Sequence, residues 1–288
     1  MQVINELVEE SFAYTNEKED MSMRRDEIGE LMEIVAYCQN EAVDEPLFYQ
    51  DVLWEIYVQK DITFADWLFG NAGAGNEEDK RRLLEALSKK EILPLDGELS
   101  KDEVSEREEI LISLGASQGH VSKVQDYIQV RRDILASIRN VNGYEAFMRS
   151  CFINSCFADG ILSGMKHIQD FPERTREITD ALGILNDKAV ALYQQYPDHL
   201  QEAMKILSSS LQRKCTPDPA HAKDLVFTFT YSEQLEGSDV AKVKEIECSP
   251  HLKLLHPGSD LRIYFYWCDE AVGKGEKVLV GRIGRHPY

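Results

Sequence analysis

The spacing of apolar residues changes after Lys214, and this change constrains the fold more than any other feature of the sequence. Before it, apolar residues recur at the three- and four-residue intervals of an amphipathic helix, for example over residues 178–192 and 200–211. After it they alternate with polar residues, most clearly over residues 261–267, as in a half-buried strand. We therefore predict an α+β fold, with a large acidic all-helical region followed by a small C-terminal antiparallel β-sheet.

The charge of the chain is divided at the same place. The 288 residues have a formal net charge of −19, whereas the 11 basic and 11 acidic residues after Gln212 cancel. All of the excess acid therefore lies in the predicted helical region. A chain this acidic repels nucleic acid and anionic lipid, except where basic residues gather locally.

Turn-forming segments predict three parts. Breaks at Gly70–Gly75, Leu93–Gly97 and Thr216–Pro219 separate the periodic stretches. We predict an N-terminal helical region over residues 1–95, a second helical region over 96–212 and an antiparallel β-meander domain over 213–288. The glycine segment is a linker rather than a phosphate-binding loop, because acidic residues follow its last glycine where a lysine is required.

The six cysteines are widely scattered and none belongs to a C-x-x-C pair, which is typical of reduced thiols in the cytoplasm. A zinc site built from Cys151, Cys156 and a distant histidine lacks the usual paired spacing, so we predict no metal and no cofactor. The sequence shows neither a secretory signal nor a membrane span. We expect a cytoplasmic protein with no membrane partner.

Residues 110–126 have the pattern of a helix-turn-helix. In that interpretation Gly115 forms the turn, and the second helix presents four side chains to the DNA major groove. These are Gln118, His120, Ser122 and Lys123. The alternative is a helix, a glycine turn and a second helix inside a bundle, without any DNA-binding role.

The last two predicted strands carry a more specific pattern. Residues 260–267 read DLRIYFYW, and residues 277–288 read KVLVGRIGRHPY. Together they resemble the last two strands of RelE/ParE-like bacterial toxins, a family that places a helical hairpin between its first and second strands. The resemblance implies an RNA-directed, endoribonuclease-like protein of toxin–antitoxin or phage-defence type. At matching positions it points to Arg262, Arg285, His286 and Tyr288 as site residues.

Such a site would cleave RNA without a metal, through attack of the 2′-hydroxyl on its own phosphodiester. His286 or His256 would transfer protons, because imidazole titrates near neutral pH. Arginines would hold the phosphate, and tyrosines would stack on bases. The residues predicted for these two binding roles are Arg262, Arg282 and Arg285, and Tyr264 and Tyr266. RNA or the ribosome would then be the partner.

A non-enzymatic interpretation of the chain also stays open. Alternating arginine and tyrosine is also what the polar face of any half-exposed sheet shows, so the C-terminal domain could be catalytically silent. The protein would then be a non-enzymatic interaction module whose acidic surface docks on a basic patch of a protein partner or cognate regulator.

Overall fold

The computed structural model describes most of the chain, and the account below is confined to those residues: 2–14, 21–38, 40, 43, 45–70, 81, 92–94, 109–115, 119–220, 222–235, 238–255 and 259–287. Contacts divide the chain into two compact units, Met1–Val130 and Arg131–Tyr288. Sequence patterns alone predict boundaries near residues 95 and 212 instead.

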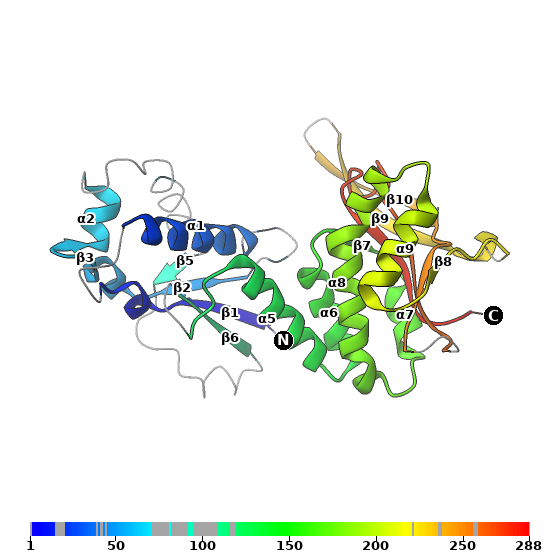
Figure 1. Cartoon of the computed structure of the whole chain (residues 1–288), viewed down its shortest axis with the longest axis horizontal. Coiled ribbons are helices and arrows are strands. Elements are labelled where there is room, and N and C mark those ends of the chain that lie inside the picture. Colours follow the sequence, from blue (N-terminus) through cyan, green and yellow to red (C-terminus); the bar gives the residue numbers. More distant parts are fainter. Residues whose placement is uncertain are drawn as a thin grey trace. The chain divides into compact units, whose positions relative to one another are not determined.

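The first unit is built on a parallel sheet with strand order β5-β2-β1-β6. All three strand pairs are parallel. The strands are β1 (Gln2–Leu7), β2 (Leu47–Tyr49), β5 (Ile92–Pro94) and β6 (Glu109–Leu114). Helix α1 (Met21–Cys38) connects β1 to β2 and lies along one face of the sheet, as Figure 1 shows.

Short elements follow β1 and β2 in the first unit. They are the 3-10 helices η1 (Glu9–Phe12) and η2 (Asp51–Glu55), the strands β3 (Tyr57–Gln59) and β4 (Ile62–Thr63), and helix α2 (Phe64–Phe69). Thr63 begins α2 as an N-cap, since its hydroxyl accepts a hydrogen bond from the Asp66 N–H. Helix α5 (Val124–Ser137) follows β6.

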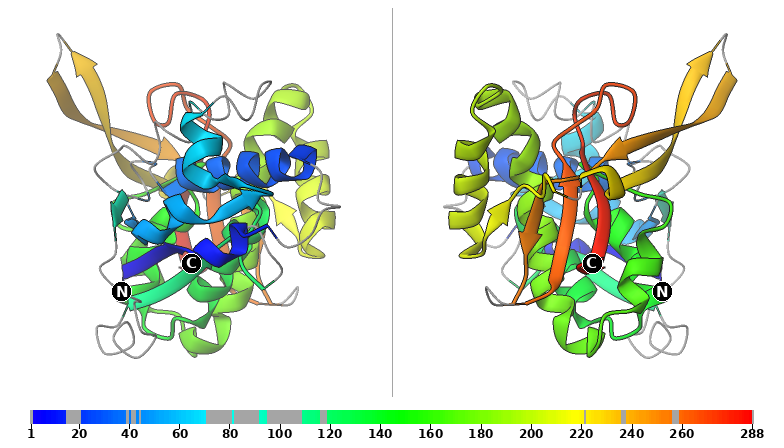
Figure 2. Two further views of the ribbon diagram at one scale, coloured as in Figure 1. Left: turned by 90° about the vertical axis from the view of Figure 1, so that its left-hand side faces the viewer. Right: turned by 90° about the vertical axis from the view of Figure 1, so that its right-hand side faces the viewer.

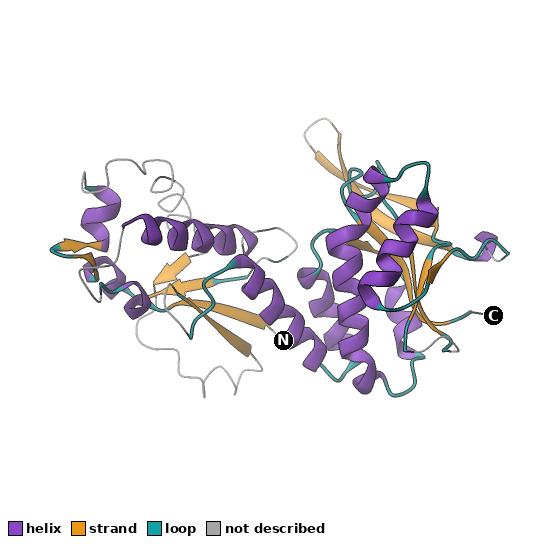
Figure 3. Cartoon of the chain, viewed as in Figure 1, coloured by secondary structure: helices purple, strands orange, loops and turns teal. Residues whose placement is uncertain are grey.

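The predicted fold class is therefore wrong. Strands occur throughout the chain, interspersed with helices, rather than after an all-helical region (Figure 3). The error has a physical cause in β6, where residues 110–112 form an unbroken apolar run. Strands of a parallel sheet are covered on both faces and lack the alternation that identifies a half-exposed strand, so a short apolar run resembles a buried helix.

The predicted helix-turn-helix is also corrected. Residues 109–114 form strand β6 and not a helix, and α5 begins only at Val124. The first of the two required helices is therefore absent, and the segment is a strand, a loop and a helix. Gly115 has a packing role there, because a Cβ atom at this position would lie 2.3 Å from the Ser11 Oγ.

The second unit is built on a five-stranded sheet with the order β7-β13-β12-β11-β8. Strand β7 pairs with β13 in parallel, and the other pairs are antiparallel. The strands are β7 (Ser155–Phe157), β8 (Cys215–Thr216), β11 (His251–Lys253), β12 (Leu261–Tyr266) and β13 (Val278–Arg285). The strand expected over 261–267 is thus confirmed, but it is buried on both faces.

Helices cover one side of this sheet. They are α6 (Val141–Cys151), α7 (Ile161–Lys166), α8 (Phe171–Gln195) and α9 (Leu200–Leu211). The 3-10 helix η3 (Ala222–Asp224) lies just before the hairpin described below. Because β7 precedes α8 and α9, this helical pair lies between the first and second strands of the sheet in chain order. Among the described residues, no helix is long and apolar enough to cross a membrane.

A long hairpin completes the second unit. Strands β9 (Val226–Leu235) and β10 (Ser238–Glu247) pair over ten residues and form a sheet of their own. The end of this hairpin extends away from the five-stranded sheet, as Figure 2 shows. At its base, Phe229 and Ile246 pack with Tyr264 and Leu279 of the main sheet in one buried cluster. The hairpin therefore covers part of the sheet face to which Tyr264 belongs.

Candidate functional site

The strand register brings chemistry-bearing side chains together in two rows across the second unit's sheet. Residues directly opposite each other in an antiparallel pair point to the same face. The histidine row crosses four strands and consists of Thr216, His251, Tyr264 and Arg282. The lysine row lies beside it and consists of Lys214, Lys253, Arg262 and Gly284.

His251 is a deeply buried imidazole in the histidine row. Its residue is only 4% exposed, its Nε2 lies 3.3 Å from the Thr216 Oγ1, and its ring lies 5.1 Å from that of Tyr264. Burial, reinforced by the positive charge of Arg262, lowers the pKa of His251 to about 4. The imidazole is therefore neutral at physiological pH.

The lysine row places like charges opposite each other. The Lys253 N–H donates to the Lys214 carbonyl, which continues the β8–β11 register and sets the two lysines side by side. Neither Nζ lies within 4 Å of a carboxylate oxygen in the described part of the chain. Like charges directly opposite each other destabilise a sheet, so the pairing of these two lysines does not stabilise the fold.

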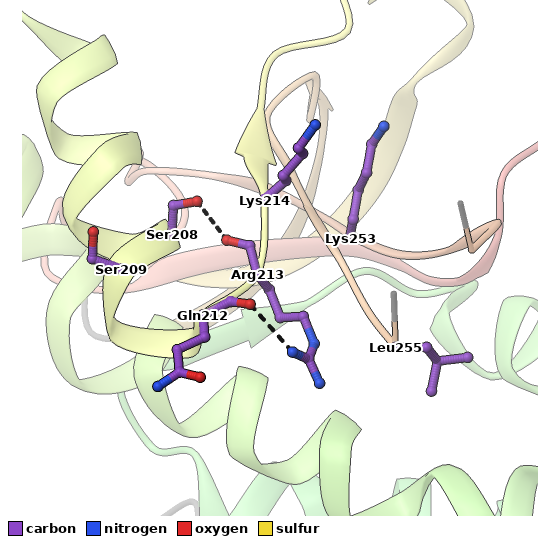
Figure 4. Close-up of a pocket in the computed structure, with 7 residues that line it drawn as sticks. All are labelled: Ser208, Ser209, Gln212, Arg213, Lys214, Lys253 and Leu255. Atoms are coloured by element: carbon purple, nitrogen blue, oxygen red, sulfur yellow. Dashed lines mark hydrogen bonds between the residues drawn. The ribbon is translucent and has the colours of Figure 1, made fainter. Parts of the chain in front are cut away.

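A cavity of about 270 Å³ adjoins the two lysines. Figure 4 shows Lys214 and Lys253 extending side by side, while the Arg213 guanidinium points elsewhere. The Arg213 Nε lies 2.9 Å from the Glu177 Oε1, so its charge is already balanced. The cavity is lined by Ser208, Ser209, Gln212, Arg213, Lys214, Lys253 and Leu255.

His286 follows β13 and lies between a carboxylate and a phenol. Its Nδ1 is 3.4 Å from the Tyr264 hydroxyl oxygen, and its Nε2 is 3.7 Å from the Asp218 Oδ2. The Asp218 backbone N–H donates to the Ser249 Oγ, which fixes the loop that carries the carboxylate. The His286 side chain is 24% exposed. A carboxylate, an accessible imidazole and a buried tyrosine hydroxyl therefore form one chain of polar groups.

The three predicted arginines occupy different environments. Arg262 is buried, and its Nη1 donates to the Ser259 carbonyl, so it braces the β11–β12 connection. The Arg282 Nε donates to the Arg285 carbonyl at 3.3 Å. The Arg285 Nε lies 3.6 Å from the Asp260 Oδ2, and its side chain is 43% exposed. Arg282 and Arg285 are thus partly exposed, whereas Arg262 is buried.

The tyrosines differ from the surface rings that the sequence predicts. Tyr264 is completely buried, so its ring is not available to stack on a base, and its hydroxyl contacts His286 instead. Tyr266 packs against the cluster under the hairpin, and burial raises its pKa. His256 and Tyr288 lie outside the described residues.

The four residues proposed for DNA contact belong to the first unit. His120, Ser122 and Lys123 lie in the connection from β6 to α5, and Gln118 lies outside the described residues. They do not form part of the two rows, which belong to the second unit.

Sequence reasoning missed Asp218, Thr216 and the two lysines of the lysine row as site residues. Asp218 lies in a Pro-Asp-Pro stretch that indicates only a linker, and His251 has the pattern of a turn-flanking residue. These residues come to the same sheet as His286 because strands that are far apart in the sequence pair with each other. No local pattern carries that information.

Within the described residues, no group of three or more histidine, cysteine, aspartate or glutamate side chains is arranged to hold a metal ion. No protein-family model, curated protein or solved structure matches the chain. Any assignment of function therefore rests on the residues themselves.

Proposed function

We propose that the second unit cleaves RNA by metal-independent phosphodiester transfer, as a RelE/ParE-toxin-like protein of toxin–antitoxin or phage-defence type. The sequence of β12 and β13 supports the resemblance. So does the position of the α8–α9 pair between the first and second strands of the sheet. The observation that carries the proposal is His286, held between the Asp218 carboxylate and the Tyr264 hydroxyl while still accessible.

His286 acts as the proton-transfer group in this reaction. The neutral imidazole takes the proton of a ribose 2′-hydroxyl as that oxygen attacks the adjacent phosphorus. The bond from phosphorus to the 5′-oxygen breaks, and that oxygen takes the proton from the imidazolium, which returns His286 to its neutral form. The products are a 2′,3′-cyclic phosphate and a 5′-hydroxyl. Asp218 stabilises the imidazolium that forms and holds the ring in position.

Positive charge near the phosphorane stabilises the transition state. Arg285 is partly exposed and adjacent to His286 in the chain, and the lysine row supplies two more cations on the sheet face that carries Tyr264. This positive charge has to be concentrated at the site, because the chain as a whole carries a charge of −19 and repels RNA elsewhere. The residues after Gln212 carry no net charge, so this part of the chain repels RNA less than the acidic remainder does.

The test is cleavage of 5′-labelled RNA, with and without ribosomes. We expect wild-type protein to release fragments ending in a 2′,3′-cyclic phosphate. The Arg285→Ala/His286→Ala variant should lose at least about 100-fold in rate, the scale of general acid–base catalysis. A matched control, His167→Ala/Arg174→Ala, removes the same residue types from the surface of the helical layer and should retain activity.

Two results would overturn the proposal. One is cleavage that persists at the wild-type rate in Arg285→Ala/His286→Ala. The other is the absence of cleavage of free and ribosome-bound RNA by correctly folded wild-type protein.

A further inference from the structure

A second surface, in the first unit, combines exposed aromatic rings with acidic side chains. Residues 49–69 contain six aromatic residues: Tyr49, Trp54, Tyr57, Phe64, Trp67 and Phe69. Three of them surround Trp54, whose ring lies 5.8 Å from Tyr49, 5.8 Å from Phe64 and 5.9 Å from Phe69. Trp54 is therefore held rigidly although it is only half-buried.

Two aromatic side chains of this segment are largely exposed and are not used by the core. Phe69 is 62% exposed and Tyr57 is 57% exposed. They belong to α2 and β3, which contact each other and form one surface with η2. Aromatic side chains held in place beforehand lose little conformational freedom on binding, and they dominate the energetics of protein interfaces. We call the surface of η2, β3 and α2 that contains Trp54, Tyr57 and Phe69 the aromatic surface.

Exposed acidic residues lie on the elements that form the aromatic surface and on the turns between them. Residues 51–69 contain four exposed carboxylates and one lysine, Lys60. The carboxylates are Asp51, Glu55, Asp61 and Asp66. This arrangement disfavours nucleic acid, anionic lipid and a second copy of the same acidic surface, because each would bring like charges together.

We propose that the aromatic surface is a docking site for a basic segment of a partner protein. The segment carries one or two large apolar side chains that pack on Phe69 and Tyr57. Its lysine or arginine side chains pair with these carboxylates and lie over the rings of Trp54 and Phe69. This interaction belongs to the first unit and does not depend on the reaction proposed for the second.

The test is selection of random dodecapeptides displayed on phage against the full-length protein, followed by affinity measurements on synthetic copies of the selected peptides. We expect the enriched peptides to carry net positive charge together with leucine or aromatic residues. Their affinity should fall at least tenfold for Tyr57→Ser/Phe69→Ser. The matched control, Val226→Ser/Val243→Ser, removes two exposed apolar side chains from the β9–β10 hairpin and should bind as wild type does.

A second pair of variants separates charge from apolar contact. Glu55→Gln/Asp61→Asn should weaken binding and reduce its dependence on salt, whereas Glu245→Gln/Glu247→Gln on β10 should not. Asparagine is suited to position 61, where φ is 59°. Enrichment of neutral or acidic peptides, no enrichment at all, or equal affinity for the surface variants and their controls would each overturn the proposal.

Discussion

Burial of the His251 imidazole should make the stability of the second unit depend on pH. The pKa of this side chain falls from 6.5 to about 4 on folding, with burial as the main cause and Arg262 as the second. Between these two values the unfolded chain binds a proton that the folded chain excludes. The free energy of unfolding therefore rises with pH across this window and falls as the solution is acidified.

The size of the effect follows from the same two values. The full difference between the two pKa values is worth about 3 kcal/mol of free energy of unfolding. About 2 kcal/mol of this stability is lost when the pH falls from 7 to 5. Substituting His251→Gln removes the titrating group while retaining a polar side chain next to Thr216. Wild-type protein should therefore lose about 2 kcal/mol more than His251→Gln over this pH interval.

Urea unfolding at the two pH values measures this difference. The chain has three tryptophans, and a Trp54→Phe/Trp67→Phe background leaves Trp267, which is buried in the second unit, as the only fluorescent reporter of its type. His167→Gln serves as the control, because its ring is exposed on α7. If wild type and His251→Gln lose the same stability between pH 7 and pH 5, the imidazole is not kept neutral by burial and the reasoning is refuted.

Two further predictions concern packing and thiol reactivity in the second unit. Gly281→Ala should lower the free energy of unfolding by about 1–3 kcal/mol in thermal or denaturant unfolding, because the added Cβ would meet the Phe227 ring at 2.3 Å and the Cys248 Sγ at 2.9 Å. Gly160→Ala, where no atom lies within 4 Å, should be nearly neutral, and equal losses in both variants would contradict this packing account. Iodoacetamide should modify Cys268 well before Cys248 in native protein, since Cys248 is fully buried and burial raises the pKa of its thiol. Peptide mapping by mass spectrometry measures the order, and early modification of Cys248 would show that the hairpin does not cover it.

The candidate site was only partly visible in the sequence. Arg285 and His286 were expected together because they are adjacent in the chain, at the end of a strand with clear alternation. The partner of His286 was not expected, because Asp218 lies 68 positions earlier in a proline-flanked loop. Whether a tyrosine offers its ring or its hydroxyl also depends on what covers it, and the hairpin that buries Tyr264 cannot be placed from local pattern.

The sequence by itself determined the elements in which apolar residues recur at a regular interval. Helices α8 and α9 and strands β9, β12 and β13 follow from periodicity, because in these segments the pattern of apolar residues matches the local period of the backbone. Only the tertiary structure decided the parallel sheet of the first unit. Strand β2 has just three residues and β6 is a short apolar run, and each becomes a strand by hydrogen bonding to β1, a segment far away in the chain. Backbone hydrogen bonds of a helix are local, whereas those of a parallel sheet require a distant partner, and that partner is supplied only by the fold.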